Sequence, residues 1–155
     1  MKLKINYVYL PAVTIAVAVG GSFITSAGMD WYRTLVLPGL APAGSVIGSI
    51  WTVIFILSTI AALLVWNQQP RPKNFSAIVW LFAASAALNL FWSAVFFGWH
   101  QLGWAIVEMV VLNLANLVLI IKLWPKNKPA SILLWPYFIW VCFATYLAGL
   151  IWRLN

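Results

Sequence analysis

The chain has 155 residues, of which 65% are hydrophobic and 7% are charged, and its formal net charge at pH 7 is +7. A soluble domain needs a surface of mixed charge, and a chain with so few charged residues cannot supply one. The long segments are apolar on almost every side, which is the pattern that lipid requires. The sequence therefore predicts an all-α membrane protein and argues against a soluble domain.

Five segments are long enough to cross a bilayer, because about 20 helical residues span its hydrocarbon core. They cover residues 7–25, 45–66, 75–97, 104–123 and 131–152, and a long first connection covers residues 26–44. A backbone in lipid must satisfy its own hydrogen bonds, and these segments lack the alternation of barrel strands. We predict one domain over residues 1–155, built as a bundle of five transmembrane helices.

The first segment has an alternative interpretation. Lys2 and Lys4 precede its apolar run, and a cleavable signal peptide has the same order of charge and apolar residues. Cleavage would leave four spans. The run is long for a leader and a membrane bundle follows at once, so we expect the first helix to be retained.

The basic residues lie at the ends of the predicted helices and are not interleaved with aromatic residues, which argues against nucleic-acid binding. If the helices cross alternately, one side carries Lys2, Lys4, Arg71, Lys73, Lys122, Lys126 and Lys128. The other side carries only Arg33 and Arg153. Positive charge favours the cytoplasmic side, so we expect a cytoplasmic N-terminus. The single cysteine, Cys142, excludes a disulfide within the chain.

The chain contains 11 tryptophans, and tryptophan is enriched at membrane interfaces. Six lie near predicted helix ends and are assigned to interfacial belts: Trp66, Trp80, Trp99, Trp104, Trp124 and Trp152. Trp51, Trp92 and Trp140 fit a belt less well. A role inside the bundle is therefore considered for these three.

The helical rise gives an estimate of how deep each residue lies in the membrane, and several of these residues lie at a similar depth. Trp51 lies about 10 Å below the outer end of its helix, and Asn89 and Ala144 lie about 12 Å below theirs. Asn89, Trp92, Ser93 and Phe96 share one helix face by their spacing. Aromatic faces with a few polar groups suit a flat conjugated ligand, so this level is a candidate pocket. Asn89 and Ser93 are equally compatible with bonds to a neighbouring helix.

Other polar residues give weaker signals. Glu108 is the only acid inside a predicted span, and a functional role and a structural bond near His100 are equally compatible with it. Asn113 and Asn116 are predicted to form hydrogen bonds between helices. Because the chain has one histidine and one cysteine, no metal site is predicted. No catalytic motif is present either, so no catalytic residue is predicted.

Ala83 and Ala87 have the spacing of small residues that lets two membrane helices approach closely. They lie on the face of the third predicted helix that points away from Asn89. We predict a homodimer through this face, and packing within the monomer is an equally simple interpretation.

A series of short strings along nearly the whole chain resembles one known family. The strings are Trp31-Tyr32 with Leu35, Pro38, Pro42 and Trp51-Thr52; Asn89-Leu90, Trp92-Ser93 and Phe96-Phe97-Gly98; Ala105 with Glu108; and Pro136-Tyr137, Trp140, Phe143-Ala144 and Trp152-Arg153. Their order and spacing resemble the translocator protein family, which includes bacterial tryptophan-rich sensory proteins and the mitochondrial peripheral benzodiazepine receptor.

The resemblance implies a five-helix bundle whose cavity, closed by the first loop, takes porphyrins and synthetic isoquinoline or benzodiazepine-type ligands. The matching positions imply a pocket of Trp31, Tyr32, Trp51, Phe55, Asn89, Trp92, Ser93, Phe96, Trp140, Phe143 and Ala144. It also implies the inner membrane of a bacterial cell, or the mitochondrial outer membrane if the source is eukaryotic. The family's helix-2 tyrosine is Phe55 here, and its sterol-recognition tyrosine is Gly149, so sterol recognition is not supported.

The leading functional hypothesis is a tetrapyrrole-binding sensor or transporter that requires no cofactor, with a porphyrin or haem-type molecule as ligand. The first alternative is an enzyme that degrades porphyrin in the presence of light and oxygen. The second is a proton-coupled transporter that uses Glu108, or a structural partner in a larger complex. The sequence does not choose among these functions.

Overall fold

The computed structural model describes residues 4–155, so Lys2, which entered the charge prediction, lies outside the described residues. Five helices are long and apolar enough to cross a membrane. They are α1 (Asn6–Ala27), α3 (Gly44–Asn67), α4 (Phe75–Ser93) with its π-helical extension η1 (Ala94–Gly98), α5 (Leu102–Leu123) and α6 (Lys128–Leu154). The predicted all-α bundle of five spans is confirmed, and the predicted bounds agree with these to within three residues.

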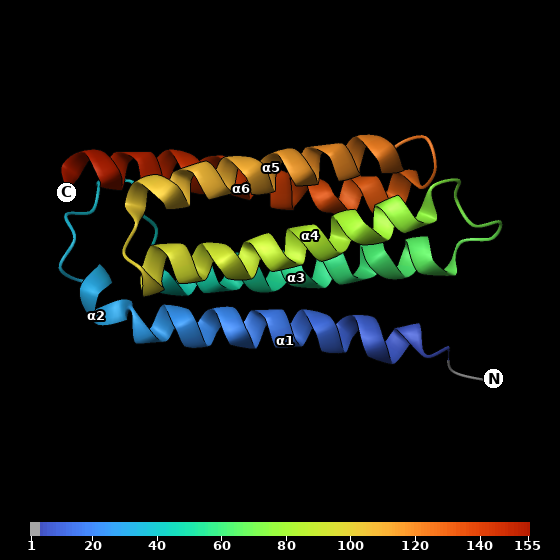
Figure 1. Cartoon of the computed structure of the whole chain (residues 1–155), viewed down its shortest axis with the longest axis horizontal. Coiled ribbons are helices and arrows are strands. Elements are labelled where there is room, and N and C mark those ends of the chain that lie inside the picture. The colour runs from blue at the N-terminus through green and yellow to red at the C-terminus, as the bar shows by residue number, and fades with distance from the viewer. Residues whose placement is uncertain (1–3) are drawn as a thin grey trace.

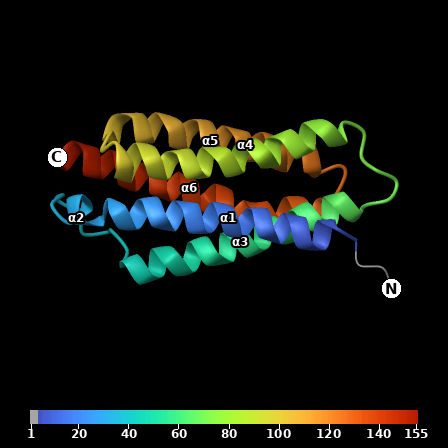
Figure 2. The ribbon, with the colours of Figure 1, turned by 60° about the horizontal axis from the view of Figure 1, so that its bottom comes forward.

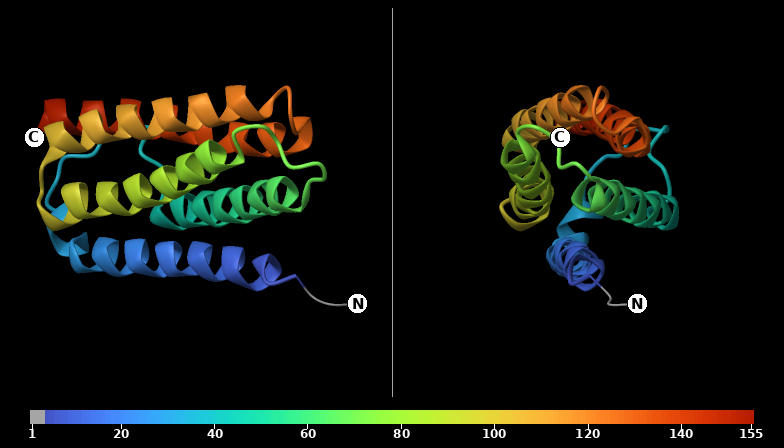
Figure 3. Two further views of the ribbon diagram at one scale, coloured as in Figure 1. Left: turned by 45° about the vertical axis from the view of Figure 1, so that its right-hand side comes forward. Right: turned by 90° about the vertical axis from the view of Figure 1, so that its right-hand side faces the viewer.

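The long helices run side by side along the long axis of the molecule, with the two termini at opposite ends (Figures 1 and 2). Helix α5 packs against α4 and α6, and α6 packs against α3. Helix α1 packs against both α3 and α4. The backbones of α3 and α4 lie apart along most of their length, and their side chains meet near the basic end, where Trp66 packs on Phe75 and Phe82. The end-on view shows α1 covering the gap between α3 and α4, opposite α5 and α6 (Figure 3, right).

The predicted loop over residues 26–44 is more ordered than expected. Helix α1 continues to Ala27, and a short helix, α2 (Met29–Tyr32), follows after one glycine. The remaining segment is fixed to the far end of the chain, because the side chain of Asn155 bonds to both the amide nitrogen of Val36 (2.9 Å) and its carbonyl oxygen (3.1 Å). We call this end of the bundle, with α2 and the C-terminal residues, the loop end.

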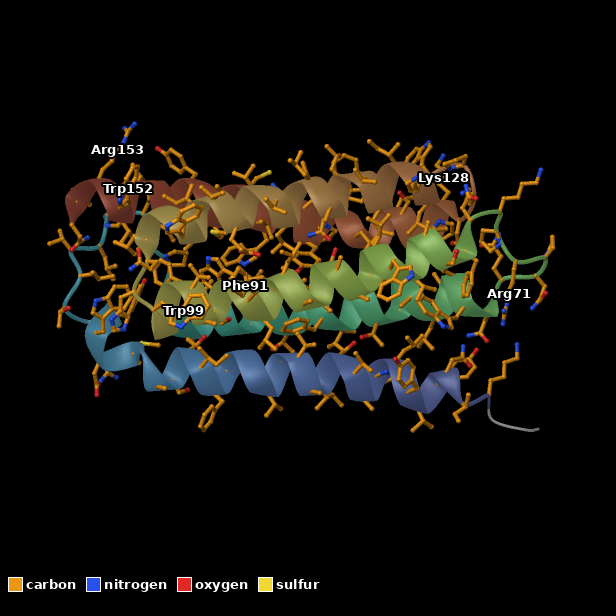
Figure 4. The ribbon with its side chains drawn as sticks, viewed as in Figure 1. Arg71, Phe91, Trp99, Lys128, Trp152 and Arg153 are labelled. Carbon is orange, nitrogen blue, oxygen red and sulfur yellow. The ribbon has the colours of Figure 1, made fainter. Side chains whose placement is uncertain are left out.

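The opposite end, which we call the basic end, contains the connections α3–α4 and α5–α6. Figure 4 shows Arg71 and Lys128 at this end and Arg153 at the loop end. The described basic residues therefore separate along the bundle as the sequence predicted. Which end faces the cytoplasm stays a prediction.

Buried apolar side chains fill the bundle at three levels. Near the basic end, Val65, Ile78, Leu119 and Leu134 belong to one cluster. A middle cluster surrounds Tyr137, and a third lies at the loop end and includes residues of η1. No residue of α1 is buried, so α1 is the helix least anchored by the core.

Polar side chains connect the helices as predicted for Asn113 and Asn116. The Ser85 hydroxyl on α4 lies 3.1 Å from Oδ1 of Asn116 on α5, and Asn113 donates to Sγ of Cys142 on α6 at 2.9 Å. These hydrogen bonds between neutral side chains determine how each helix is rotated about its own axis. Hydropathy alone does not determine that rotation, because the helices are apolar on almost every side.

Candidate functional site

The π-helical turn η1 turns three consecutive side chains inward at the loop end. A π turn inserts one extra residue into the helical repeat, so Val95, Phe96 and Phe97 are all buried. The rings of Trp92 and Phe96 are 5.3 Å apart, and Phe96 and Phe97 are 4.8 Å apart. The turn therefore concentrates aromatic surface directly below the first connection.

Helix α2 contributes two more aromatic residues, which pack against the aromatic side chains of η1. The Trp31 ring lies edge to face with Phe96 at 5.8 Å and stacks on His100 at 4.0 Å. The Tyr32 ring lies 5.6 Å from that of Phe97. Together with Trp92 these residues form the loop-end aromatic cluster: Trp31, Tyr32, Trp92, Phe96 and Phe97.

Gly28 makes this contact possible, because α1 and η1 approach closely at its position. A methyl group at Gly28 would overlap the carbonyl oxygen of Phe97 and crowd the Phe97 side chain. Gly28 is also buried. The glycine between α1 and α2 therefore sets how closely α2 lies on the cluster.

The environment of Tyr32 gives a pH prediction. Burial raises the pKa of the Tyr32 phenol above its ordinary value of 10.0. The protonated phenol then contributes stability that is fully present below pH 10 and is lost as pH rises through the folded-state pKa. We expect the ultraviolet titration of the chain minus that of Tyr32→Phe to show a midpoint above pH 10.0. A difference midpoint at or below that value would show that Tyr32 is accessible to water.

A cavity of about 150 Å³ lies in the gap between α3 and α4 that α1 covers. All five long helices line it, and most of its wall is apolar. Its polar residues are Tyr9, Thr14, Ser58, Thr59, Ser85, Asn89, Asn116 and Tyr137. On one side the Thr59 hydroxyl donates to that of Thr14 at 2.8 Å, which joins α3 to α1. We call this space the central cavity.

The structure divides the predicted site residues into groups. Trp31, Tyr32, Trp92 and Phe96 belong to the loop-end aromatic cluster, while Asn89 and Phe55 line the central cavity. Trp51, Trp92, Trp140 and Ala144 pack around the middle core cluster. Phe143 packs on Trp140 at 5.4 Å, and Ser93 faces α1 at Gly21. Trp92 contacts both clusters and so connects the two groups.

Trp51 and Phe55 connect the middle cluster with the cavity. The Trp51 ring lies 5.7 Å from Phe55, and it meets Tyr137 edge to face at 5.9 Å. Phe55 and Tyr137 both line the cavity. Trp51 therefore adjoins the cavity through Phe55 and Tyr137, and the role of the predicted residues in ligand binding stays a prediction.

Four buried polar atoms near these residues have no hydrogen-bond partner within residues 4–155. They are Oγ of Ser58, Nε1 of Trp92, Nδ2 of Asn116 and Nε1 of Trp140. Each comes from a different helix, α3, α4, α5 and α6 in turn. An unpaired buried group costs roughly 1–3 kcal/mol, and water or a ligand usually supplies the missing partner. These four atoms are therefore unsatisfied hydrogen-bonding groups in the interior of the bundle.

Several cavity residues were missed from the sequence. Helix α1 contributes Tyr9 and Thr14, and α6 contributes Tyr137. Trp66 was assigned to an interfacial belt, but it is half-buried, lines the cavity and packs on Phe82 at 5.9 Å. A usable signal was present for Ser85, since it precedes Asn89 by four residues and so shares its helix face. The other predicted belt tryptophans are exposed. Figure 4 labels two of them, Trp99 and Trp152, in the part of the bundle toward the loop end.

Two further predicted features can be placed. Glu108 is buried, and neither carboxylate oxygen has a hydrogen-bond partner in the described part of the chain, so the bond near His100 is not formed. Ala83 and Ala87 are both exposed on α4, but Ala83 also lines the central cavity beside Asn89, so only Ala87 lies on a face turned away from the cavity. The homodimer stays a prediction.

Comparison with known proteins identifies the family. The model of the TspO/MBR family matches residues 8–153. A tryptophan-rich protein TspO of Chlorobaculum tepidum is 36% identical over 142 residues, which cover 91% of this chain and 90% of the relative. Protein CrtK of Rhodobacter capsulatus is 31% identical over all of this chain and 95% of its own length. The human translocator protein is 29% identical over 93% of this chain and 86% of its own.

These matches cover all five spans and both clusters of site residues. The matched range also includes every string of residues that carries the resemblance. The chain belongs to the TspO/MBR family, whose members named above include translocator and tryptophan-rich proteins.

Proposed function

We propose that this membrane protein binds a flat, largely apolar ligand of the tetrapyrrole type between its helices and acts on it as a sensor or translocator. The observation that carries the proposal is the set of four unpaired polar atoms, one from each of α3 to α6. Two belong to Ser58 and Asn116 on the wall of the central cavity, and two belong to Trp92 and Trp140, which pack on the middle core cluster. The rings supply stacking surface, and the indole and amide N–H groups supply donors for oxygen or nitrogen acceptors at the edge of the ligand.

The ligand would extend from the central cavity toward Trp51 and Trp92. Pockets for drug-sized ligands have volumes of roughly 300–1,000 Å³, whereas the cavity measures about 150 Å³. Binding of a tetrapyrrole therefore requires the helices to separate. Helix α1 is the element best suited to move, because none of its residues is buried and one pair of threonine hydroxyls joins it to α3.

A paired-variant titration tests this proposal. A free-base porphyrin added to the purified chain should quench tryptophan fluorescence saturably. We expect the double variant Trp51→Ala, Trp140→Ala to bind at least tenfold more weakly, because it removes two rings beside the cavity. The control is Trp80→Ala, Trp104→Ala, which removes two rings that are 74% and 68% exposed.

The control variant should retain the affinity of the unaltered chain, apart from a smaller quenching amplitude. Unchanged affinity in the Trp51→Ala, Trp140→Ala variant would show that the ligand does not use this site. An equal loss in both double variants would indicate partition of the porphyrin onto the lipid-facing surface.

A further inference from the structure

The basic end carries a concentration of positive charge without any acid. Its described basic residues are Lys4, Arg71, Lys73, Lys122, Lys126 and Lys128. The chain has only two acidic residues: Asp30 lies in α2 at the loop end, and Glu108 lies in the half of α5 nearer that end. Nothing in the sequence can therefore neutralise these cations from within the chain.

Hydrogen bonds hold the two basic connections together despite their like charges. Gln68 donates to the carbonyl of Lys126 (3.0 Å) and accepts from the side chain of Asn127 (3.0 Å). The Lys126 ammonium donates to the carbonyl of Lys73 at 2.9 Å. We call the four residues of these bonds at the basic end the loop clasp: Gln68, Lys73, Lys126 and Asn127. Like charges brought close repel each other, so a fixed group of this kind favours a bound anion.

Aromatic residues mark the depth of these cations in the membrane. The Arg71 guanidinium lies over the Phe75 ring at 5.0 Å, and the Lys128 ammonium lies over the Trp124 ring at 4.9 Å. Trp124 is 47% exposed at the end of a membrane-spanning helix, where indole rings lie at the level of the lipid headgroups. Lys128 therefore lies at the level of lipid phosphates, and Arg71 lies at the same end of the bundle. Guanidinium and ammonium groups bind such phosphates well.

We propose that the basic end is a binding site for the headgroup of an anionic phospholipid. Arg71, Lys73 and Lys128 supply the cations, and the loop clasp fixes the spacing of the two connections. An excess of positive charge that only orients the chain in the membrane depends on the number of cations and not on their spacing. A specific headgroup site depends on the number of cations and also on their spacing. This difference makes the proposal testable.

The binding experiment uses the purified chain in a neutral detergent, titrated with dioleoylphosphatidylglycerol or dioleoylphosphatidylcholine. Bound lipids are counted by native mass spectrometry. We expect phosphatidylglycerol to bind saturably and at least tenfold more tightly than phosphatidylcholine, with an affinity that falls as sodium chloride rises. Inorganic phosphate at the same concentrations should not displace it. Equal affinities for the two lipids, or displacement by inorganic phosphate, would overturn the proposal.

Charge variants locate the site. Lys73→Gln, Lys128→Gln should lower the affinity for phosphatidylglycerol about 25-fold, since each cation near the headgroups contributes about fivefold. This variant retains the Lys73 carbonyl that the clasp uses. Arg33→Gln, Arg153→Gln removes the same charge from the loop end and should leave the affinity unchanged. Equal losses at the two ends would overturn the proposed location.

A variant without any charge change tests the clasp. Gln68→Ala removes two hydrogen bonds between the connections and should lower the affinity for phosphatidylglycerol several-fold. Its thermal unfolding in phosphatidylcholine alone shows whether the bundle is intact. If an intact Gln68→Ala variant bound phosphatidylglycerol as tightly as the unaltered chain, the spacing of the cations would not matter. The positive charge of the basic end would then only orient the chain in the membrane, and the proposed site would be wrong.

Discussion

The Ala86→Phe substitution is expected to lower porphyrin affinity at least tenfold without unfolding the bundle. Ala86 lines the central cavity from α4, and a phenyl ring at this position would occupy much of a space of about 150 Å³. The ring would compete directly with the ligand. Burial of the added apolar surface offsets part of the overpacking cost, which is about 1–3 kcal/mol. Porphyrin titration and thermal unfolding of the same samples measure both effects.

Ala77→Phe is the matched control, because Ala77 lies on the same helix but is exposed. It adds the same side chain on the lipid-facing side and should leave affinity unchanged. Ala86→Leu should give an intermediate loss, since it fills less of the cavity. Full affinity in an intact Ala86→Phe variant would show that the ligand binds elsewhere.

The Gly28→Val substitution is expected to displace α2 from the loop-end aromatic cluster. Side-chain atoms at this position overlap the backbone of Phe97, which cannot move without disturbing η1. We expect a loss of about 1–3 kcal/mol in the free energy of unfolding. Hydrogen exchange over residues 28–34 should become faster, because the contacts of Trp31 and Tyr32 are lost.

Gly39→Val provides the comparison, since a side chain at Gly39 meets nothing within 4 Å. Both variants introduce valine into the first connection, so any difference reports the close approach at Gly28. We also expect weaker porphyrin binding in Gly28→Val. Equal stability and equal exchange rates in the two variants would contradict the packing of α2 described above.

The number and bounds of the spans could be predicted because a helix that crosses lipid must be apolar over its whole length. A stretch of about 20 apolar residues has few alternatives to a membrane helix, and Pro70, Pro72 and Pro125 separate the stretches clearly. The short helix α2 was not predicted, because four residues carry too little pattern to distinguish a helical turn from a loop. Its position depends on the close contact at Gly28.

The depth of the site residues was easier to predict than their direction. Helical rise places Trp51, Asn89 and Ala144 at similar levels, but it does not show which face of each helix points inward. Segments that are apolar all round give no such signal, so Trp66 was assigned to a belt although it lines the cavity. Its direction is set by packing against Phe75 and Phe82.

The contribution of α1 to the cavity could not be predicted for a related reason. The residues of α1 that line it are mainly apolar, and their spacing fits lipid contact equally well. Helix α1 can line the cavity because the backbones of α3 and α4 lie apart and α1 packs against both of them. That arrangement depends on packing between helices that are far apart in the sequence. Likewise, the extra residue in η1 turns Phe97 inward, which a regular helical repeat does not predict.

Methyl NMR of the porphyrin complex tests most directly whether the ligand binds between the helices. Val17 and Val79 line the central cavity and are partly buried, whereas Val110 and Val118 are 46% and 40% exposed on α5. With carbon-13-labelled valine methyl groups, the ring current of a stacked porphyrin should shift the Val17 and Val79 signals saturably and leave Val110 and Val118 unchanged. Shifts at Val110 and Val118, with none at Val17 and Val79, would place the ligand on the lipid-facing surface and contradict the account.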